Sequence, residues 1–280
     1  MDVDLYEVNT FSNRPQGGNP LGVILLEEWL ATRTLQLMAG QTLKPVTAFA
    51  VPRGTAWEIR CFTGLREIAL NGSAVLAAAA VIMDFVDRAQ RRLTFVHPKG
   101  TAEVWRQEGR LHLDLPQWRL RLRDEAEPVL AALGVTQGEV WQGRDIVVVL
   151  ENRQQVAALN PDFIRLAQLP AALVVVTAAD QASRYVLRAF SPATGVCEDA
   201  ATATAHCALA PFWAARLGGH HWQAEQLSPR RAEFTCELLG NRVVIKSEVL
   251  QVRHKLLPLP QEAAPVSSLS TPGQAPQLLS

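Results

Sequence analysis

Two stretches of small residues, far apart in the chain, constrain its fold more than any other feature. The first reads GSAVLAAAAV from Gly72, and the second reads AATATAHCALA from Ala200. Alanine-rich runs favour helix, and a helix that is small and apolar on all sides has no face suited to water. Each helix must therefore be enclosed, and its small side chains let surrounding strands approach its backbone closely.

A similar segment leads into each of these two stretches. The first lead begins RCFTG at Arg60, and the second begins RAFSP at Arg188. Each has Arg-x-Phe, then a hydroxyl residue, then a Gly or Pro turn. The repeat predicts two similar halves, each a β-sheet wrapped around one buried helix, with both helix starts facing a shared cleft.

Two helix starts that face each other would form a polarised pocket. The first N–H groups of a helix have no partner within it, and they lie at the positive end of the helix dipole. Such groups bind carboxylates and stabilise negative charge that develops during a reaction. The paired helices therefore predict a site for a small carboxylate-bearing substrate or an enolate-like charge.

Strand-like segments occupy most of the remaining chain. Hydrophobic alternation dominates them, and tight turns are expected at residues 107–109 and 240–241. The pattern predicts an α+β fold with an N-terminal half over residues 1–122 and a C-terminal half over residues 123–258. Residues 259–280 are rich in Pro, Ser and Gln, which predicts a flexible tail.

Charge and composition exclude several functions. The 27 Lys and Arg residues equal the 27 Asp and Glu residues in number, so nothing favours nucleic acid or an anionic membrane as partner. The acidic start does not resemble a signal peptide, and the most apolar run, residues 75–83, is too short to span a bilayer. A cytoplasmic protein is expected. The four cysteines form no Cys-x-x-Cys pair, so neither a metal site nor a disulfide framework is expected.

Four motifs stand in the order and spacing of a known family. They are VNTFSNRPQGGNPLGVIL from Val8, VTAFAVP from Val46, IRCFTGLREIALNGSAVLAAAAVI from Ile59 and LRAFSPATGVCEDAATATAHCALAPFW from Leu187. With them the chain resembles the phenazine-biosynthesis PhzF-like family, relatives of diaminopimelate epimerase, over about residues 3 to 255. The resemblance implies a diaminopimelate-epimerase-like fold of two pseudo-symmetric halves and a homodimer. It also implies isomerase or epimerase chemistry by proton transfer, with no metal and no organic cofactor.

The resemblance also locates positions where proton-handling groups of the family are missing here. The family's general acid/base, a glutamate in a Ser-Glu-Thr motif, corresponds to Val46 before Thr47. The family's Cys-Gly-His at the first helix start corresponds to Asn71-Gly72-Ser73. A positioned acid or base contributes roughly 10²- to 10⁴-fold in rate, so the family's usual reaction is not expected to run here unaltered.

The family motif before the second helix is largely retained. Its Glu-Asp-Pro corresponds to Glu198-Asp199-Ala200, and the Gly-Ser that follows corresponds to Ala203-Thr204. Asp199 is the preferred acid/base, because desolvation of a carboxyl group at this place would raise its pKa. The alternative is that Asp199 is an ordinary helix N-cap.

Two further residues are candidates for a catalytic role. Cys197 precedes a helix start, where a thiolate is stabilised, and the alternative is a plain reduced thiol. Lys44 lies two residues before Val46 and could supply a proton or bind a carboxylate, and the alternative is an exposed charge. His206 is expected to be a core histidine rather than a catalyst.

The residues expected to bind substrate lie in one turn, at one strand and at the two helix starts. Their polar groups would hydrogen-bond the substrate, and the alternative is that several of them serve as caps or turn residues. They are Asn19, Val46, Thr47, Asn71, Gly72, Ser73, Ala203 and Thr204.

These features together favour an isomerase that acts by cofactor-independent proton transfer. It would move a double bond in a small carboxylate-bearing intermediate of secondary metabolism, such as antibiotic biosynthesis, with Asp199 as the proton shuttle. One alternative is a cyclase that shapes a polyene-like substrate without a strong base. The other is a non-catalytic binding or scaffold member of the family.

Overall fold

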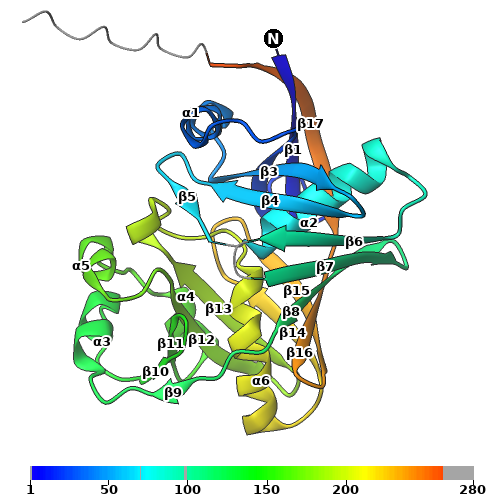
Figure 1. Ribbon diagram of the computed structural model, residues 1–280. Helices are drawn as coiled ribbons and strands as arrows, with labels where there is room; N and C mark the ends of the chain where they lie inside the picture. The colour runs from blue at the N-terminus through cyan, green and yellow to red at the C-terminus, as the bar shows by residue number, and fades with distance from the viewer. Residues whose placement is uncertain (1, 70, 98–99, 261–280) are drawn as a thin grey trace, which may run out of the picture.

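The strands of the described residues form one hydrogen-bonded sheet that divides into two halves, here called the first and second sheets. Each half is wrapped around a helix, in an α+β fold as the sequence predicts (Figure 1). The computed structural model describes residues 2–69, 71–97 and 100–260. Of the predicted flexible tail, residues 261–280 lie outside the described residues.

The first half carries its sheet around helix α2. Its elements are β1 (Asp2–Thr10), β2 (Asn19–Leu25), α1 (Thr32–Thr42), β3 (Val46–Arg53), β4 (Ala56–Phe62), β5 (Glu67–Ile68), α2 (Gly72–Val81), the π-helical turn η1 (Ile82–Val86), β6 (Arg92–His97), β7 (Gly100–Gln107) and β8 (Arg110–Pro116).

The second half carries its sheet around helix α6. Its elements are β9 (Arg121–Leu122), α3 (Glu127–Leu133), β10 (Glu139–Gln142), β11 (Ile146–Val149), α4 (Arg153–Ala157), α5 (Phe163–Gln168), β12 (Val174–Gln181), β13 (Arg184–Phe190), the 3₁₀ turns η2 (Pro192–Thr194) and η3 (Ala203–Ala205), α6 (His206–Leu217), β14 (His221–Gln226), β15 (Ala232–Leu239) and β16 (Arg242–Ser247), followed by β17 (Val249–Pro258).

The two sheets repeat the same succession of strand pairings. In the first, the order β1-β2-β3-β4-β6-β7-β8 pairs antiparallel, parallel, antiparallel, parallel, antiparallel and antiparallel. The order β10-β11-β12-β13-β14-β15-β16 repeats that succession in the second. Helix α2 connects β4 and β5 to β6, and α6 connects β13 to β14 at the matching place. The predicted pseudo-symmetry is therefore confirmed strand by strand.

Strands of each half complete the sheet of the other. β17 pairs antiparallel with β1, β9 pairs antiparallel with β10, and β8 pairs antiparallel with β16. Residues 249–258, which the sequence assigns to the C-terminal half, therefore lie in the first sheet. Residues 121–122, assigned to the N-terminal half, lie in the second. These shared pairings hold the two halves against each other.

Both hairpin turns expected from the sequence are confirmed. β7 and β8 are joined at Glu108-Gly109, and β15 and β16 at Gly240-Asn241. Gly109 and Gly240 have φ of 76° and 57°, in the left-handed region where glycine has no steric penalty.

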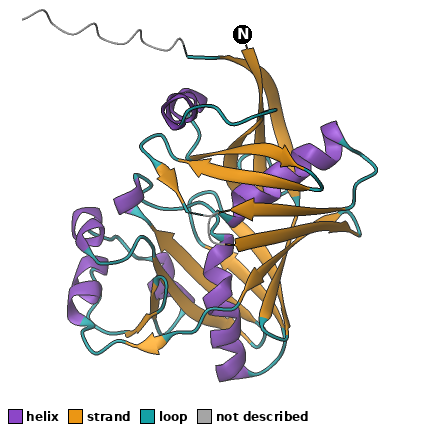
Figure 2. Cartoon of the chain, viewed as in Figure 1, coloured by secondary structure: helices purple, strands orange, loops and turns teal. Residues whose placement is uncertain are grey.

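Helix α2 is enclosed as its composition predicts, because every residue from Gly72 to Val81 is buried. The outer face of the first sheet is covered by α1, and that of the second by α3, α4 and α5 (Figure 2). Helix α6 is buried only over its first turns, since Ala215, Arg216 and Leu217 are exposed. The small-residue run itself is enclosed as expected, since residues 201–210 are all buried, and the exposed turn lies beyond it.

Candidate active site

The starts of the two small-residue helices meet in the middle of the molecule (Figure 1). A Cβ placed on Gly72 would lie 2.9 Å from the Cβ of Ala203, so the backbone of the α2 start rests against the methyl group of the η3 start. Gly72 is needed here because any side chain would collide with that methyl group and with Leu113, 3.1 Å away. The predicted convergence of the two helix starts is therefore present.

The first helix start is capped by its own segment. The side chain of Asn71 accepts a hydrogen bond from the backbone N–H of Ala74 at 3.0 Å, as an N-cap residue does. The buried Ser73 hydroxyl donates to the carbonyl of Ala201 at 2.9 Å and so ties α2 to the second half. Both residues thus take up positions expected from the sequence, and both make structural hydrogen bonds.

The segment before the second helix start carries the carboxyl group of Asp199. This carboxyl accepts hydrogen bonds from Asn19 Nδ2 at 3.2 Å and from the Thr202 hydroxyl at 2.8 Å. The backbone amides of Ala200 and Ala201 also hydrogen-bond it. Burial raises the pKa of Asp199 to about 6, and these hydrogen bonds only partly oppose the rise. A carboxyl group with this pKa exchanges protons readily near neutral pH.

The alternative role of Asp199 as an ordinary N-cap is not what the structure has. Residues 199–202 are not helical, and the first 3₁₀ turn begins at Ala203. Hydrogen bonds across the molecule hold this segment outside the helix, since the Ala201 carbonyl accepts from both Asn19 Nδ2 at 2.9 Å and Ser73. The helix therefore starts several residues later than its composition predicts.

The second helix start leaves backbone donors available. Among the described residues, no side chain caps η3, and the amide N–H groups of Ala203 and Thr204 have no hydrogen-bond acceptor. Both residues are buried. Unpaired amides at the positive end of a helix favour an anion, so this end of the junction can hold a carboxylate or an oxyanion.

The other sequence candidates lie in different surroundings. Lys44 donates to Glu7 at 2.7 Å and is not hydrogen-bonded to the Asp199 group. Cys197 is exposed, two residues before Asp199. The Thr47 hydroxyl bonds Thr42 at 2.8 Å, on the face of β3 that packs against α1. These three side chains are not brought together with Asp199.

Val46 faces the opposite side of β3 from Thr47. It is 5% exposed and packs in the same apolar cluster as the alanines of α2. Its side chain thus belongs to the enclosure of the first helix, at the edge of the junction.

The repeated Arg-x-Phe motif has a structural explanation. Arg60 makes two hydrogen bonds to the carboxylate of Glu67, and Arg188 does the same with Glu198 at 2.8 Å each. In both halves the arginine thus pins the loop that leads to the helix start. Glu198, next to Asp199, is committed to this pair.

His206 lies in the core, as expected. It is fully buried, its Nδ1 hydrogen-bonds the Tyr185 hydroxyl at 2.6 Å, and burial lowers its pKa to about 3. A neutral imidazole packed between aromatic rings, with Phe234 4.2 Å away, contributes to packing rather than to proton transfer at neutral pH.

Several residues around the site carry no sequence signal. Thr202 and Gln226 hydrogen-bond the Asp199 segment, and Arg144 reaches the Thr204 hydroxyl at 3.4 Å. Arg144 stacks 3.9 Å above the ring of Trp118. The contacts of Gln226 and Arg144 are tertiary and no local spacing reveals them, whereas Thr202 bonds Asp199 from only three residues away.

Within the described ranges, no group of three or more His, Cys, Asp or Glu side chains is arranged to hold a metal ion. In the same residues, no helix combines the length and the apolar character needed to cross a membrane.

The fold has two halves whose helix starts converge beside an acidic residue, and its relatives place the chain in the isomerase and epimerase class. The model of the phenazine biosynthesis-like protein family matches residues 8–238, and the chain belongs to that family. A Pseudomonas aeruginosa protein named as an uncharacterized isomerase is 41% identical over 254 residues, which cover 90% of this chain and 97% of the relative. A Vibrio cholerae protein with the same description is 33% identical over 237 residues, or 84% of this chain and 83% of the relative.

Solved structures agree with this assignment. A PhzF-family phenazine biosynthesis protein from Enterococcus faecalis superposes with a TM-score of 0.86 at 34% identity, covering 92% of this chain and all of that one. A probable proline racemase from Agrobacterium radiobacter, with bound carbonate, has a TM-score of 0.64 at 11% identity and 92% and 93% coverage. The second likeness is one of fold alone.

Proposed function

We propose that this chain is an isomerase that moves a proton with Asp199 and so shifts a double bond in a small carboxylate-bearing intermediate of secondary metabolism. The observation that carries the proposal is the carboxyl group at the helix junction, whose pKa is raised to about 6. Such a group is ionised often enough at neutral pH to accept a proton and protonated often enough to return it.

The proposed mechanism uses only groups of this chain. Asp199 takes a proton from the carbon next to the substrate's unsaturated group and returns it at the other end of the shifted double bond. Asn19 and Thr202 orient the carboxyl through their hydrogen bonds. The amides of Ala203 and Thr204 stabilise the negative charge that develops on the substrate.

A second candidate is a binding protein that has kept the fold without the chemistry. It is favoured by the contact between Gly72 and the Ala203 methyl group, which occupies the space between the helix starts. The buried valine at position 46, where the family resemblance places a glutamate, supports the same candidate.

Solvent exchange separates the two candidates. The protein in D₂O would be incubated with a panel of small unsaturated carboxylates, including unsaturated cyclic amino acids, and deuterium incorporation followed by mass spectrometry. We expect incorporation into at least one of them and a roughly 10²- to 10⁴-fold slower rate in Asp199→Asn. Cys197→Ser and Lys44→Met are the matched controls. Exchange that is absent from the wild type, or unchanged in Asp199→Asn, contradicts the proposal.

A further inference from the structure

The turn between β14 and β15 contacts both halves of the candidate site. We define the 226–231 segment as Gln226 to Arg231, the last residue of β14 and the turn before β15. It lies between residues 199–202, which carry Asp199, and residues 15–18, which precede Asn19. It belongs to none of the four motifs that the sequence singles out.

Gln226 holds the Asp199 segment by both ends of its side-chain amide. Its Oε1 accepts from the backbone N–H of Thr202 at 2.7 Å, and its Nε2 donates to the backbone carbonyl of Asp199 at 2.6 Å. Because one neighbour is a donor and the other an acceptor, only this orientation of the amide satisfies both. Gln226 is fully buried, so neither bond is replaced by water.

The same amide also sets the direction of a hydroxyl group. Gln226 Nε2 donates to the Thr202 hydroxyl oxygen at 3.3 Å. With a donor on that side, the Thr202 hydroxyl directs its own proton to Asp199 Oδ2, 2.8 Å away. Gln226 therefore acts on the Asp199 carboxyl through Thr202.

The rest of the segment ties down both halves. The buried Ser228 hydroxyl donates to the Ala200 carbonyl at 2.7 Å. Arg230 donates to the carbonyls of Gly18 at 2.8 Å and Gly17 at 3.1 Å, just before Asn19. Asn19 in turn donates to the Asp199 carboxyl, so one turn fixes the first-half and second-half partners in register.

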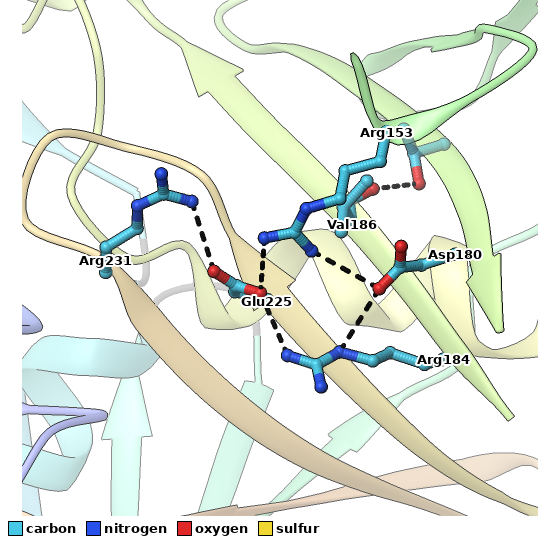
Figure 3. A network of polar contacts seen from close by, with 7 residues as sticks. Arg153, Asp180, Arg184, Val186, Glu225 and Arg231 are labelled. Atoms are coloured by element: carbon cyan, nitrogen blue, oxygen red, sulfur yellow. Dashed lines mark hydrogen bonds and ion pairs between the residues drawn. The ribbon is translucent and has the colours of Figure 1, made fainter. Parts of the chain in front are cut away.

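A network of charged side chains anchors this turn from outside (Figure 3). Glu225, next to Gln226, accepts from Arg153 at 2.8 Å, from Arg184 at 2.9 Å and from Arg231 at 3.1 Å. Arg153 and Arg184 also pair with Asp180. The network joins α4, β13 and β14 to the far end of the 226–231 segment, so the turn is held at both ends.

We propose that Gln226 is a positioning residue of the active site, which acts through Thr202 to hold the Asp199 carboxyl in its reactive setting, and that Ser228 and Arg230 complete this positioning element. The inference deepens the proposed function and rests on it for its catalytic meaning. All four groups that hydrogen-bond the carboxyl, Asn19, Thr202 and the amides of Ala200 and Ala201, are uncharged. The ionisation of Asp199 therefore responds to their orientation rather than to a neighbouring charge.

The test is a titration of Asp199 in the full chain, without any substrate. Protein with ¹³C-labelled aspartate would be titrated by NMR, with the Asp199 signal assigned by its loss in Asp199→Asn. In Gln226→Met the Thr202 hydroxyl loses its hydrogen bond from Gln226 and donates less to the carboxylate. We therefore expect the pKa of Asp199 to rise from about 6 to at most about 7. Gln223→Met, at an exposed glutamine on the same strand, should leave that pKa unchanged.

A double-mutant cycle separates positioning from a merely structural role. Thr202→Val should raise the pKa of Asp199, and Gln226→Met should add nothing in that background. If Gln226→Met does not fold, Gln226→Glu keeps the acceptor for the Thr202 N–H and should raise the pKa more than Gln223→Glu does. The inference is overturned if the pKa of Asp199 stays the same or falls in Gln226→Met. It is also overturned if Thr202→Val and Gln226→Met change that pKa independently, or if Gln226→Glu and Gln223→Glu change it equally. If the double-mutant cycle gives the expected pKa changes but no deuterium is incorporated in the exchange assay, the proposed function is wrong and the positioning role of Gln226 stands.

Discussion

The two helix starts occupy matching places in the repeated fold, yet they are finished in different ways. α2 begins directly at its cap, with the Asn71 side chain on the Ala74 amide and every following residue buried. The second helix begins with a 3₁₀ turn that no described side chain caps, after a non-helical segment that carries Asp199. The α2 start satisfies its own backbone N–H groups, whereas the second start leaves two backbone amides and the Asp199 carboxyl available for a ligand.

This difference supports the proposal that the first start serves stability and the second start serves the reaction. Groups that are fully satisfied within their own segment have no interaction left for a ligand. A partly buried carboxyl with a raised pKa beside unpaired amides costs stability, and such costs are concentrated at functional sites. We therefore propose that the reaction takes place at the second helix start, and that the first helix start packs against it and supports it.

The largest expected effect is on the pH dependence of stability. The unfolded Asp199 carboxyl ionises near 3.8 and the folded one near 6, so its contribution to the free energy of unfolding is greatest below pH 4 and is lost as the pH rises to about 6. Asp199→Asn removes the penalty and should be more stable than wild type at pH 8 by up to about 3 kcal/mol. Denaturant unfolding of both proteins from pH 4 to 8 measures the difference. A difference that does not change with pH would contradict the raised pKa.

The contact between the helix starts is tested by matched glycine substitutions. Gly72→Ala should lower the free energy of unfolding by about 1 to 3 kcal/mol, because the new methyl group collides with Ala203. Gly40→Ala, in helix α1 with open space around it, should instead stabilise by about 0.5 to 1 kcal/mol. Urea unfolding measures both.

The double variant Gly72→Ala with Ala203→Gly removes the collision and should recover most of the lost stability. Equal effects of Gly72→Ala and Gly40→Ala would mean that the helix starts do not touch.

Cap removal should affect only the first start. Asn71→Ala removes the hydrogen bond to Ala74 and should cost about 1 kcal/mol. Thr204→Ala, at the uncapped start, should cost less than about 0.5 kcal/mol, since its hydroxyl makes only a long contact to Arg144. Thermal unfolding ranks the two variants, and a larger loss in Thr204→Ala would reverse the comparison.

The smallest effect is expected at Cys197. Its side chain is exposed, so Cys197→Ser should change the free energy of unfolding by less than about 0.5 kcal/mol. We also expect no change in deuterium exchange. A loss of exchange above tenfold in this variant, measured at constant stability, would return Cys197 to the catalytic set.

The sequence predicts the parts of the fold that local patterns specify. The hairpin turns at Gly109 and Gly240, the enclosed helix from Gly72 and the convergence of two helix starts all follow from composition and spacing. The start of the second helix does not, because the hydrogen bonds that Asn19 and Ser73 make to Ala201 come from the other half. A run of small residues cannot report such tertiary bonds.

The candidate site divides in the same way. Asp199, Asn19 and Ser73 are candidates from the motifs, Thr202 lies in the fourth motif without being singled out, and Gln226 lies in none of them. Gln226 lies 27 residues after Asp199, on a strand whose sequence contains no functional signal. The sequence also does not reveal that β9 and β17 pair with strands of the other half. Strand pairing depends on tertiary contacts rather than on the local sequence.

The central claim is that the Asp199 carboxyl at the helix junction is buried enough to exchange protons near neutral pH. The direct measurement is the ¹³C titration of Asp199 in the wild-type protein. We expect a midpoint of about 6. A midpoint near 4, the ordinary value for an aspartate in water, would contradict it.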